Sequence, residues 1–327
     1  MPDQSPRAVQ WSPVAYEKQR SKRVLARRRA VRRLWRGGGL VLAVALAVLV
    51  VHLARSANTS AAAGRDGSAG TTPVPQTKSR LAPAPVGTSD PLATSAAHAF
   101  LARRAGTVSV AVENLRTGRT WLYHPAARTQ TASIMKVDIL ETLLRQAEVT
   151  HTPLDDNVQD LAQGMIENSS DTDAQDLWDS LGGAGAIEQY NDAAGLSQTV
   201  PNPAGYWGES TTSAVDQIRL LRQLVTAHGL LNQTSRSYAL GLMENVVADQ
   251  RWGVSAGVAR NASVALKNGW VPLTSNSDWE INSIGRIKGD GRDYLIAVLT
   301  AHDSSEGYGI DTIEGISKLV WSSLGPG

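Results

Sequence analysis

Alternating apolar and polar residues mark the start of the folded region. In residues 107–112 the three valines lie on one face of an extended chain, and a period of two is typical of a half-buried β-strand. A turn signal at 114–118 is followed by a second alternating segment at 119–124. Together these segments predict a β-hairpin.

Apolar residues at helical spacing predict helices before and after this hairpin in the sequence. Residues 92–105 and 309–324 are predicted helices, and residues 154–231 are predicted to be mainly helices and loops. A further helix is predicted at 133–146, and its apolar face consists of Ile134, Val137, Ile139, Leu140, Leu143 and Leu144.

Three late segments complete the fold class. Residues 263–267, 279–287 and 293–300 are predicted strands. The order helix, hairpin, helical region, three strands, helix predicts an α+β fold. We expect one five-stranded antiparallel sheet, made of the first hairpin and the last three strands, flanked by helices and with an all-helical region inserted.

Residues 37–54 form an uncharged run of 18 residues, GGGLVLAVALAVLVVHLA. As a helix it would be about 27 Å long, close to the roughly 30 Å hydrocarbon core of a bilayer, and Arg36 and Arg55 can reach the interface. We therefore predict a transmembrane signal-anchor helix. The alternative is a cleaved signal peptide, with Ala61 and Ala63 as a small-residue cleavage site and a secreted domain.

Charge is divided between the two ends of the chain. Residues 1–36 contain 11 Lys and Arg against 2 Asp and Glu, whereas residues 90–327 contain 17 against 27. The basic segment predicts a cytoplasmic tail, which places the domain at 90–327 outside the cytoplasm. Because the positive charge is confined to the tail, nucleic-acid binding is not predicted. Residues 55–89, rich in Ala, Gly, Ser, Thr and Pro, predict a flexible linker.

The 327 residues include no cysteine. Disulfides, thiolate catalysis, lipid attachment through cysteine and cysteine metal sites are therefore excluded. The acidic cluster Asp155, Asp156 and Asp160 lacks the glycine and terminal glutamate of a calcium loop, which favours a solvated loop. Metal-ligand spacing is also missing from the six histidines, His52, His98, His124, His151, His228 and His302. No metal or organic cofactor is predicted.

Ser133 and Lys136 are the first candidates for chemistry, in the segment TASIMKV at 131–137. Three residues apart at the start of a helix, they share one face and lie beside backbone N–H groups that the helix leaves free. A serine hydroxyl needs a nearby base and oxyanion donors to act as a nucleophile, and a partly desolvated lysine loses its proton more readily. The pair is a candidate nucleophile and base. The alternative is a helix cap beside a solvated lysine.

Two later segments extend this pattern. MIENSSDTDAQDLW at 165–178 places serines on a loop before a helix, and VALKNGW at 264–270 places a lysine and a glycine on a strand. Serine–lysine, then serine with a polar partner, then lysine-x-glycine on a late strand resembles the serine β-lactamase and penicillin-binding protein superfamily. Over residues 92–327 the chain is most similar to class A β-lactamases.

The resemblance implies roles for individual residues. Ser133 would be the acylated nucleophile, Lys136 its base or proton relay, and Ser169 the shuttle that carries a proton to the leaving nitrogen. Lys267 would offer positive charge to the substrate carboxylate and to Ser169. The oxyanion hole would consist of the backbone N–H groups of Ser133 and Trp270. The substrate-binding residues would be Asp171, Asn268, Gly269 and Trp270, with Gly269 allowing the strand to approach the substrate closely.

The second and third motifs depart from the family pattern. Ser169-Ser170-Asp171 stands where the family has Ser-Asp-Asn, so Ser170 is the alternative to Ser169, although the spacing to the next glycine pair favours Ser169. Asp171 replaces an amide and cannot donate a hydrogen bond to a substrate unless it is protonated. Asn268 replaces Thr or Ser, and its amide is expected to hydrogen-bond a carboxylate.

Residues 196–210, LSQTVPNPAGYWGES, depart further. Class A enzymes carry a Glu-x-x-Leu-Asn element here, which positions the water that hydrolyses the acyl-enzyme. This segment has one carboxylate, Glu209, as a candidate deacylation base or, alternatively, as a cap of the next helix. Without such a base we expect slow deacylation, which suits a transpeptidase, a carboxypeptidase or a covalent β-lactam trap.

Other side chains are weaker candidates. His302 could complete a Ser/His/Asp triad with Ser133, and Arg286 could meet a carboxylate, the alternative being a surface arginine. Three aromatic residues could line a groove, the alternative being core packing: Trp207, Trp270 and Trp279.

The sequence therefore predicts a membrane-anchored, extracytoplasmic, β-lactamase-like serine hydrolase. It would form an acyl-enzyme with β-lactams or with D-alanyl peptides of peptidoglycan. The alternatives are a D,D-carboxypeptidase or transpeptidase, and an inactive wall-binding or regulatory module of the same fold.

Overall fold

The computed structural model describes residues 89–273 and 278–325. The tail at 1–36, the transmembrane helix at 37–54 and all but the last residue of the linker at 55–89 lie outside the described residues, so they stay predictions. Among the described residues, no helix combines the length and apolar character that a membrane span needs.

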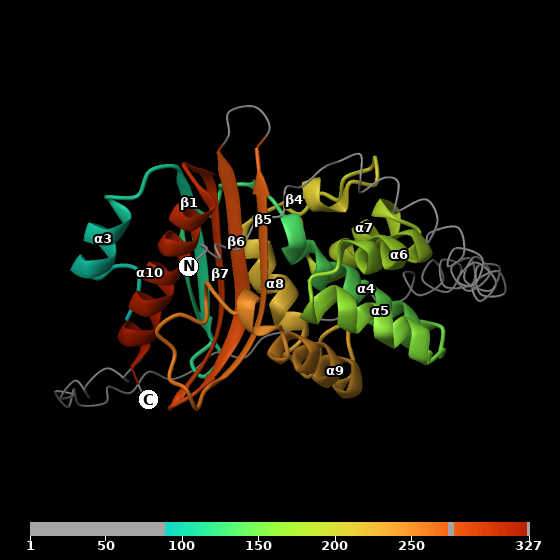
Figure 1. Cartoon of the computed structure of the whole chain (residues 1–327). Coiled ribbons are helices and arrows are strands. Elements are labelled where there is room, and N and C mark those ends of the chain that lie inside the picture. Colours follow the sequence, from blue (N-terminus) through green and yellow to red (C-terminus); the bar gives the residue numbers. More distant parts are fainter. Residues whose placement is uncertain (1–88, 274–277, 326–327) are drawn as a thin grey trace, which may run out of the picture. The chain divides into compact units, whose positions relative to one another are not determined.

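The sheet has five strands in the order β2-β1-β7-β6-β5, and all neighbours are antiparallel. It combines the hairpin β1 (Thr107–Asn114) and β2 (Arg119–Tyr123) with the three late strands β5 (Ser263–Pro272), β6 (Trp279–Gly289) and β7 (Arg292–Asp303) (Figure 1). The prediction of one five-stranded antiparallel sheet is confirmed. β5 is an edge strand, so the side away from β6 is free of sheet partners.

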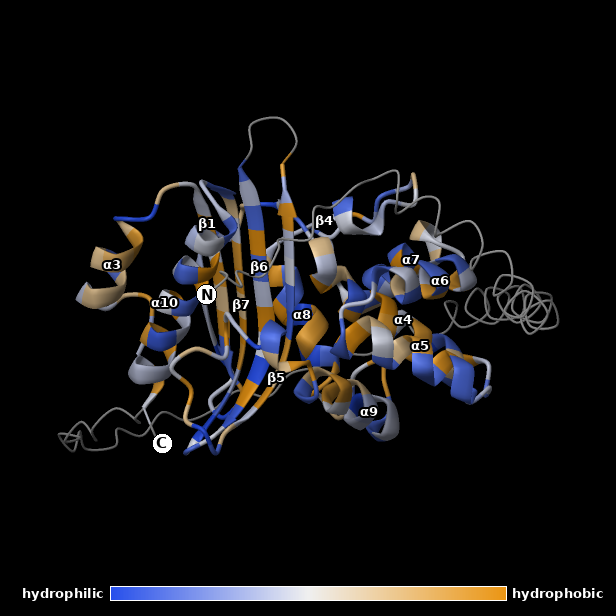
Figure 2. Ribbon diagram, in the orientation of Figure 1, coloured by the Kyte–Doolittle hydropathy of each residue, from blue (hydrophilic) through white to orange (hydrophobic). Residues whose placement is uncertain are grey.

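Helices cover both faces of this sheet. α3 (Ser95–Leu101) and α10 (Glu306–Leu324) lie on one face, while α8 (Ala214–Gln223) packs on the other. Two apolar clusters, one on each face, therefore form the core. The central strand β7 is buried on both faces and reads as a nearly continuous apolar run, which is orange in Figure 2.

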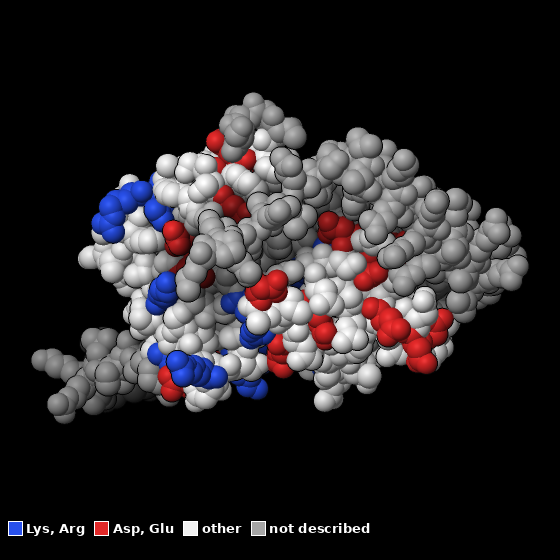
Figure 3. Space-filling view, in the orientation of Figure 1, with Lys and Arg blue, Asp and Glu red and all other residues white. Residues whose placement is uncertain are grey.

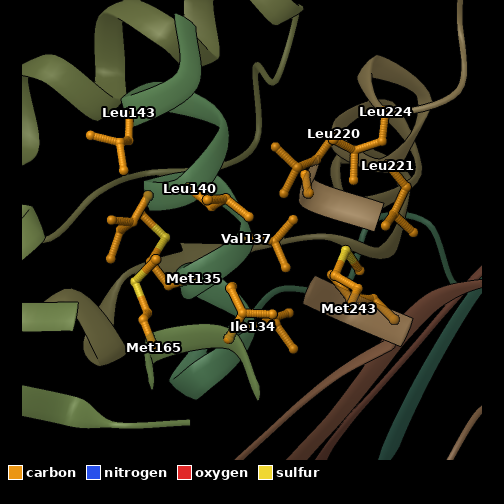
Figure 4. Close-up of a cluster of buried hydrophobic side chains, with 14 of the residues drawn as sticks. Ile134, Met135, Val137, Leu140, Leu143, Met165, Leu220, Leu221, Leu224 and Met243 are labelled. Atoms are coloured by element: carbon orange, nitrogen blue, oxygen red, sulfur yellow. The ribbon is translucent and has the colours of Figure 1, made fainter. Parts of the chain in front are cut away.

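The rest of the helical region packs around one helix, α4 (Met135–Val149). Its neighbours are α5 (Asp156–Glu167), α6 (Asp171–Leu181), α7 (Ala184–Ala194) and α9 (Gln233–Glu244). The predicted apolar face of α4 is buried, and Figure 4 shows Val137 and Leu140 of that face among side chains of other helices. Every residue from Met135 to Leu144 is buried, so this helix is enclosed on all sides.

Capping residues set several helix boundaries. Thr94 caps α3, which shortens the predicted helix at 92–105. Asp155 accepts a hydrogen bond from the Val158 N–H and caps α5. The acidic cluster therefore begins a helix where a loop was predicted, although its three residues are exposed as expected. The described residues contain no group of His, Asp or Glu that could hold a metal ion.

Acidic side chains are prominent on the helical region. On the face drawn in Figure 3 they gather over the helices, whereas basic side chains lie mostly toward the sheet. The distribution agrees with the acidic composition of residues 90–327.

Two carboxyl groups on α4 are buried in the helical region. Burial raises the pKa of Asp138 from 3.8 to about 8. Burial also raises the pKa of Glu141 well above its usual range, although this group accepts a hydrogen bond from the Tyr190 hydroxyl at 2.6 Å. Sequence analysis did not anticipate these groups.

Asp138→Asn should weaken the dependence of stability on pH. Between its unfolded and folded pKa values Asp138 is protonated in the folded state and ionised in the unfolded state, so folding takes up a proton and stability falls as pH rises. The raised pKa of Glu141 acts in the same direction and remains in the variant. We expect the melting temperature of the variant, measured relative to that of the wild type, to rise as the pH increases from about 5 to about 8.

Thermal unfolding at several pH values measures this effect. The control is Asp160→Asn, which removes an exposed carboxylate from α5. Parallel curves for Asp138→Asn and the wild type would show that Asp138 does not take up a proton on folding.

Candidate active site

Ser133 lies at the N-terminal end of α4, within the short 3-10 helix η1 (Ala132–Ile134). Neither η1 nor α4 has a side-chain cap. The N–H groups of Ile134 and Met135 donate to the carbonyls of Thr131 and Ala132, so the Ser133 N–H is the candidate oxyanion donor at this helix start. Ala132 has a φ of 45°, uncommon for a residue with a side chain. Ser133 is partly exposed, whereas Ala132 and Ile134 are buried. The fold therefore presents the hydroxyl at a helix N-terminus instead of burying it in the apolar core.

Lys136 is fully buried one helical turn after Ser133. Its Nζ donates to Ser133 Oγ at 2.9 Å and to Asp171 Oδ1 at 2.7 Å. Burial lowers the pKa of Lys136, while the charge of Asp171 and the hydrogen bond to it oppose this shift. A lysine with a lowered pKa beside a serine hydroxyl is a candidate base.

Of the two serines at the second motif, Ser169 faces the site. Its Oγ accepts hydrogen bonds from Lys136 Nζ at 3.1 Å and from Lys267 Nζ at 2.9 Å, and its φ is 54°. Ser170 caps α6 instead, because its Oγ accepts a hydrogen bond from the Asp173 N–H at 3.3 Å. The structure thus brings together Ser133, Lys136, Ser169 and Lys267 around two hydroxyl groups.

Lys267 reaches this cluster from β5. Its side chain is fully buried, and its Nζ also donates to the Asn268 carbonyl at 3.1 Å. Burial lowers the pKa of Lys267 well below its usual range, the nearby charge of Lys136 lowers it further, and Asp171 opposes both. Two lysine side chains therefore share one hydroxyl at a site where burial disfavours positive charge.

Gly269 lies where β5 meets the turn that carries Ser133. A Cβ at this position would lie 2.7 Å from the Ser133 backbone nitrogen and 2.9 Å from that of Ile134. These distances leave no room for a side chain. The close approach seen for Gly269 is to the backbone of the Ser133 turn, whereas its expected approach to a substrate stays a prediction.

The prediction for the Asn268 side chain is wrong. Its Nδ2 donates to the carbonyls of Gln250 and Trp252, at 2.8 and 3.1 Å, and its Oδ1 accepts from Ser283 Oγ at 2.6 Å. The amide is buried and already bonded, because successive side chains of a strand point to opposite faces. Trp270 shares that face and packs edge-on against Trp252, at 5.8 Å between ring centroids, so its contribution to the site is limited to its backbone.

Asp171 begins α6, and its side chain is 60% exposed. It was predicted to bind substrate. In the structure it forms an ion pair with Lys136 at 2.7 Å. Asp171 therefore raises the pKa of Lys136, the candidate base, and opposes the effect of burial.

The loop at 196–210 places a tryptophan at the site. Lys136 Nζ lies 4.9 Å from the ring centroid of Trp207, which belongs to the 3-10 helix η2 (Trp207–Glu209). Glu209 is exposed, and its carboxylate accepts a hydrogen bond from Asn202 Nδ2 at 3.4 Å. The contacts described for Glu209 include neither Ser133 nor Lys136. Its alternative role as the cap of the next helix is wrong, because Ser213 caps α8.

Two residues of β6 hold the segment before Ser133, and sequence analysis missed both. Glu280 accepts a hydrogen bond from the Gln130 N–H at 2.6 Å. Asn282 donates to the carbonyls of Gln130 and Thr131, at 2.8 and 3.2 Å. Glu280 and Asn282 are buried and lie two positions apart on a strand, and that spacing of polar residues is the signal that could have revealed them.

The weaker candidates lie elsewhere. The exposed His302 has Asp278 as its partner, 3.4 Å from Nδ1 to the carboxylate. Arg286 forms a two-point ion pair with Asp293, at 2.9 and 2.8 Å. Trp279 packs against the apolar cluster on the α10 face. The described contacts therefore place neither His302 nor Arg286 at Ser133.

Solved structures share this architecture. PBP-A aligns with a TM-score of 0.60 and 20% identity over 68% of this chain and 92% of that one. A β-lactamase from Chitinophaga pinensis aligns with a TM-score of 0.62 and 19% identity, over 69% and 96% of the two chains. The TLA-1 extended-spectrum β-lactamase reaches 0.63 at 15% identity, with the same coverage. The fold is that of the serine β-lactamase and penicillin-binding protein superfamily.

The family follows from the sequence comparison. The model of the Beta-lactamase enzyme family matches residues 150–324, more than half of the chain. The chain belongs to this family. The matched region contains Ser169 and Lys267, whereas Ser133 and Lys136 lie before it.

Curated relatives match a shorter part of the chain. "Putative lipoprotein LppW" of Mycobacterium tuberculosis and its counterpart of the same name in Mycobacterium bovis are each 29% identical over 201 residues. The match covers 59% of this chain and 62% of the length of the relatives.

Asp171→Asn should lower the pKa of Lys136 further. The substitution removes the largest of the interactions that raise this pKa, while burial, which lowers it, remains. A pH titration of the lysine ε-carbons by NMR measures the change, with Lys136→Arg assigning the resonance. Asp173→Asn is the matched control, because Asp173 makes the smallest of the contributions that raise this pKa. An equal shift in both variants would contradict the role assigned to Asp171.

Proposed function

We propose that this chain is an extracytoplasmic serine hydrolase that forms an acyl-enzyme at Ser133. The substrates are β-lactams or D-alanyl peptides of peptidoglycan. The observation that carries the proposal is the contact of Lys136 Nζ with the hydroxyls of both Ser133 and Ser169, at 2.9 and 3.1 Å. One group can therefore exchange protons with both hydroxyls.

Acylation uses this geometry directly. Neutral Lys136 takes the Ser133 proton, and Oγ bonds to the substrate carbonyl carbon. The backbone N–H groups of Ser133 and Trp270 hold the developing oxyanion. The carbon–nitrogen bond then breaks, the Ser169 hydroxyl protonates the leaving nitrogen, and Lys136 returns a proton to Ser169. Charged Lys267 attracts the substrate carboxylate, which in turn favours its protonated form.

The site favours slow release of the acyl group. Glu209 is exposed and bonded to Asn202, so the loop offers no carboxylate contact at Lys136. A D,D-carboxypeptidase or transpeptidase, or a covalent β-lactam trap, fits this geometry better than an efficient β-lactamase. PBP-A, which shares the fold, has a variant whose solved structure is an acyl-enzyme complex with penicillin G.

A penicillin should form a covalent adduct with the purified full-length chain in detergent. We expect peptide mass spectrometry to locate one intact penicillin on Ser133 and to find none in Ser133→Ala. Ser169→Ala should slow acylation by roughly 10²-fold or more, because a positioned proton donor is lost.

Ser170→Ala is the matched control for Ser169→Ala. Loss of the α6 cap should cost about 1 kcal/mol of stability and leave the rate of acylation close to that of the wild type. A folded wild-type chain that forms no adduct with several β-lactams would refute the proposal and favour the non-catalytic wall-binding or regulatory module.

We further propose that residues 37–54 anchor the domain to a membrane. Support comes from the apolar run itself, from the basic residues before it and from the relatives named as a lipoprotein. Because this sequence has no cysteine, a lipid attached through cysteine cannot supply the anchor. We expect the full chain to sediment with membranes in a bacterial host at high salt and to stay there after carbonate washing. Recovery of a shortened chain in the medium would support the cleaved signal peptide.

A further inference from the structure

Trp207 covers the base of the proposed site. Its ring centroid lies 4.9 Å from Lys136 Nζ, within the distance at which an ammonium group and an aromatic face attract each other. The side chain of Lys136 has no exposed surface, although Ser133 and Asp171 beside it are partly and largely exposed. An aromatic ring therefore forms part of the wall that keeps water from the lysine.

The loop holds this ring in place through contacts with the nucleophile segment. Thr131 Oγ1 donates to the Trp207 carbonyl at 3.3 Å, and the Thr131 N–H donates to the Ser210 carbonyl at 2.7 Å. A Cβ on Gly208 would lie 3.8 Å from the Ala132 Cα. The turn that carries Trp207 is thus fastened to the residues directly before Ser133, so the ring and the hydroxyl keep a fixed relation.

Hydrolysis of an acyl-enzyme needs a water molecule and a base beside the acyl ester. The water oxygen must bond to the ester carbonyl carbon while a base takes its proton, and the carbon–Oγ bond must then break as Oγ regains a proton. Lys136 Nζ lies beside Ser133 Oγ and is the closest candidate base in the site. A water that approached from the Trp207 side would have to occupy the space of the indole.

We propose that Trp207 is a positioning residue that excludes water from the Lys136 side of the acyl ester and thereby prolongs the life of the acyl-enzyme. The inference rests on the proposed acylation of Ser133 and adds the residue that decides the fate of the acyl group. Its consequence is selection of the acceptor. An acyl group protected from water persists until an amine acceptor arrives, as transpeptidation requires.

Two variants of Trp207 test the proposal in the full-length chain. After penicillin treatment and removal of excess reagent, mass spectrometry follows the loss of the Ser133 adduct. Trp207→Ala opens the space and should shorten the adduct lifetime by about 10-fold to 100-fold. Trp207→Phe keeps an apolar ring and should stay close to the wild type, which also covers the case in which the alanine variant folds poorly. The control is Tyr206→Ala, because Tyr206 is the exposed neighbour of Trp207 and its loss should leave the lifetime unchanged.

Chemical labelling gives a readout that does not need acylation. Acetic anhydride should modify Lys136 slowly in the wild type and in Trp207→Phe, and several-fold faster in Trp207→Ala, relative to the exposed Lys288 in the same molecule. Faster labelling with no penicillin adduct in any variant would support the shielding by Trp207 and count against the proposed function alone. Equal adduct lifetimes, or equal labelling of Lys136, in folded Trp207→Ala and the wild type would overturn the inference.

Discussion

Ser169 Oγ accepts hydrogen bonds from two buried lysine side chains, and the rest of the site is arranged around this contact. Lys136 approaches at 3.1 Å from α4 and Lys267 at 2.9 Å from β5. Two buried cations so close together are costly, because each loses hydration and repels the other. Burial accordingly lowers both lysine pKa values, and Asp171 compensates in part. The arrangement places two lysine side chains of lowered proton affinity in contact with one serine hydroxyl.

This cluster depends on the contact between the edge strand and the helix N-terminus. Gly269 allows β5 to touch the Ser133 turn, while Glu280 and Asn282 bond the residues before that turn to β6. The sheet therefore fixes the backbone of the Ser133 turn on two sides. Backbone contacts and buried hydrogen bonds set the position of the Ser133 turn. The side chains of the lysine–serine cluster therefore need little further ordering to come into contact.

Much of the fold and part of the candidate site could be predicted from the local spacing of residues in the sequence. Period-two segments predicted the strands, and the spacing of Ser133 and Lys136 predicted a shared helix face that the structure also has. The failure at Asn268 has the same origin, since a residue next to Lys267 on a strand points to the other face. The buried carboxyl groups of α4 could not be predicted, because composition argues against burying charge and only the packing of other helices encloses them. Trp207 reaches Lys136 through loop geometry, and no periodic signal encodes that.

The loop at 196–210 is closed at both ends by contacts that belong to the core of the domain. β3 (Thr129–Gln130) and β4 (Thr211–Thr212) pair across its exit, and Asp216 accepts hydrogen bonds from the Gln198 N–H and the Thr199 hydroxyl near its entry. Between these contacts, Trp207 and Ser210 bond Thr131 next to the Ser133 turn, so a change in length or content is best tolerated before Trp207, where Pro203, Ala204 and Tyr206 are exposed. Such a segment can vary between two fixed ends, so the scaffold can present different side chains to the lysine–serine cluster while the cluster itself stays the same.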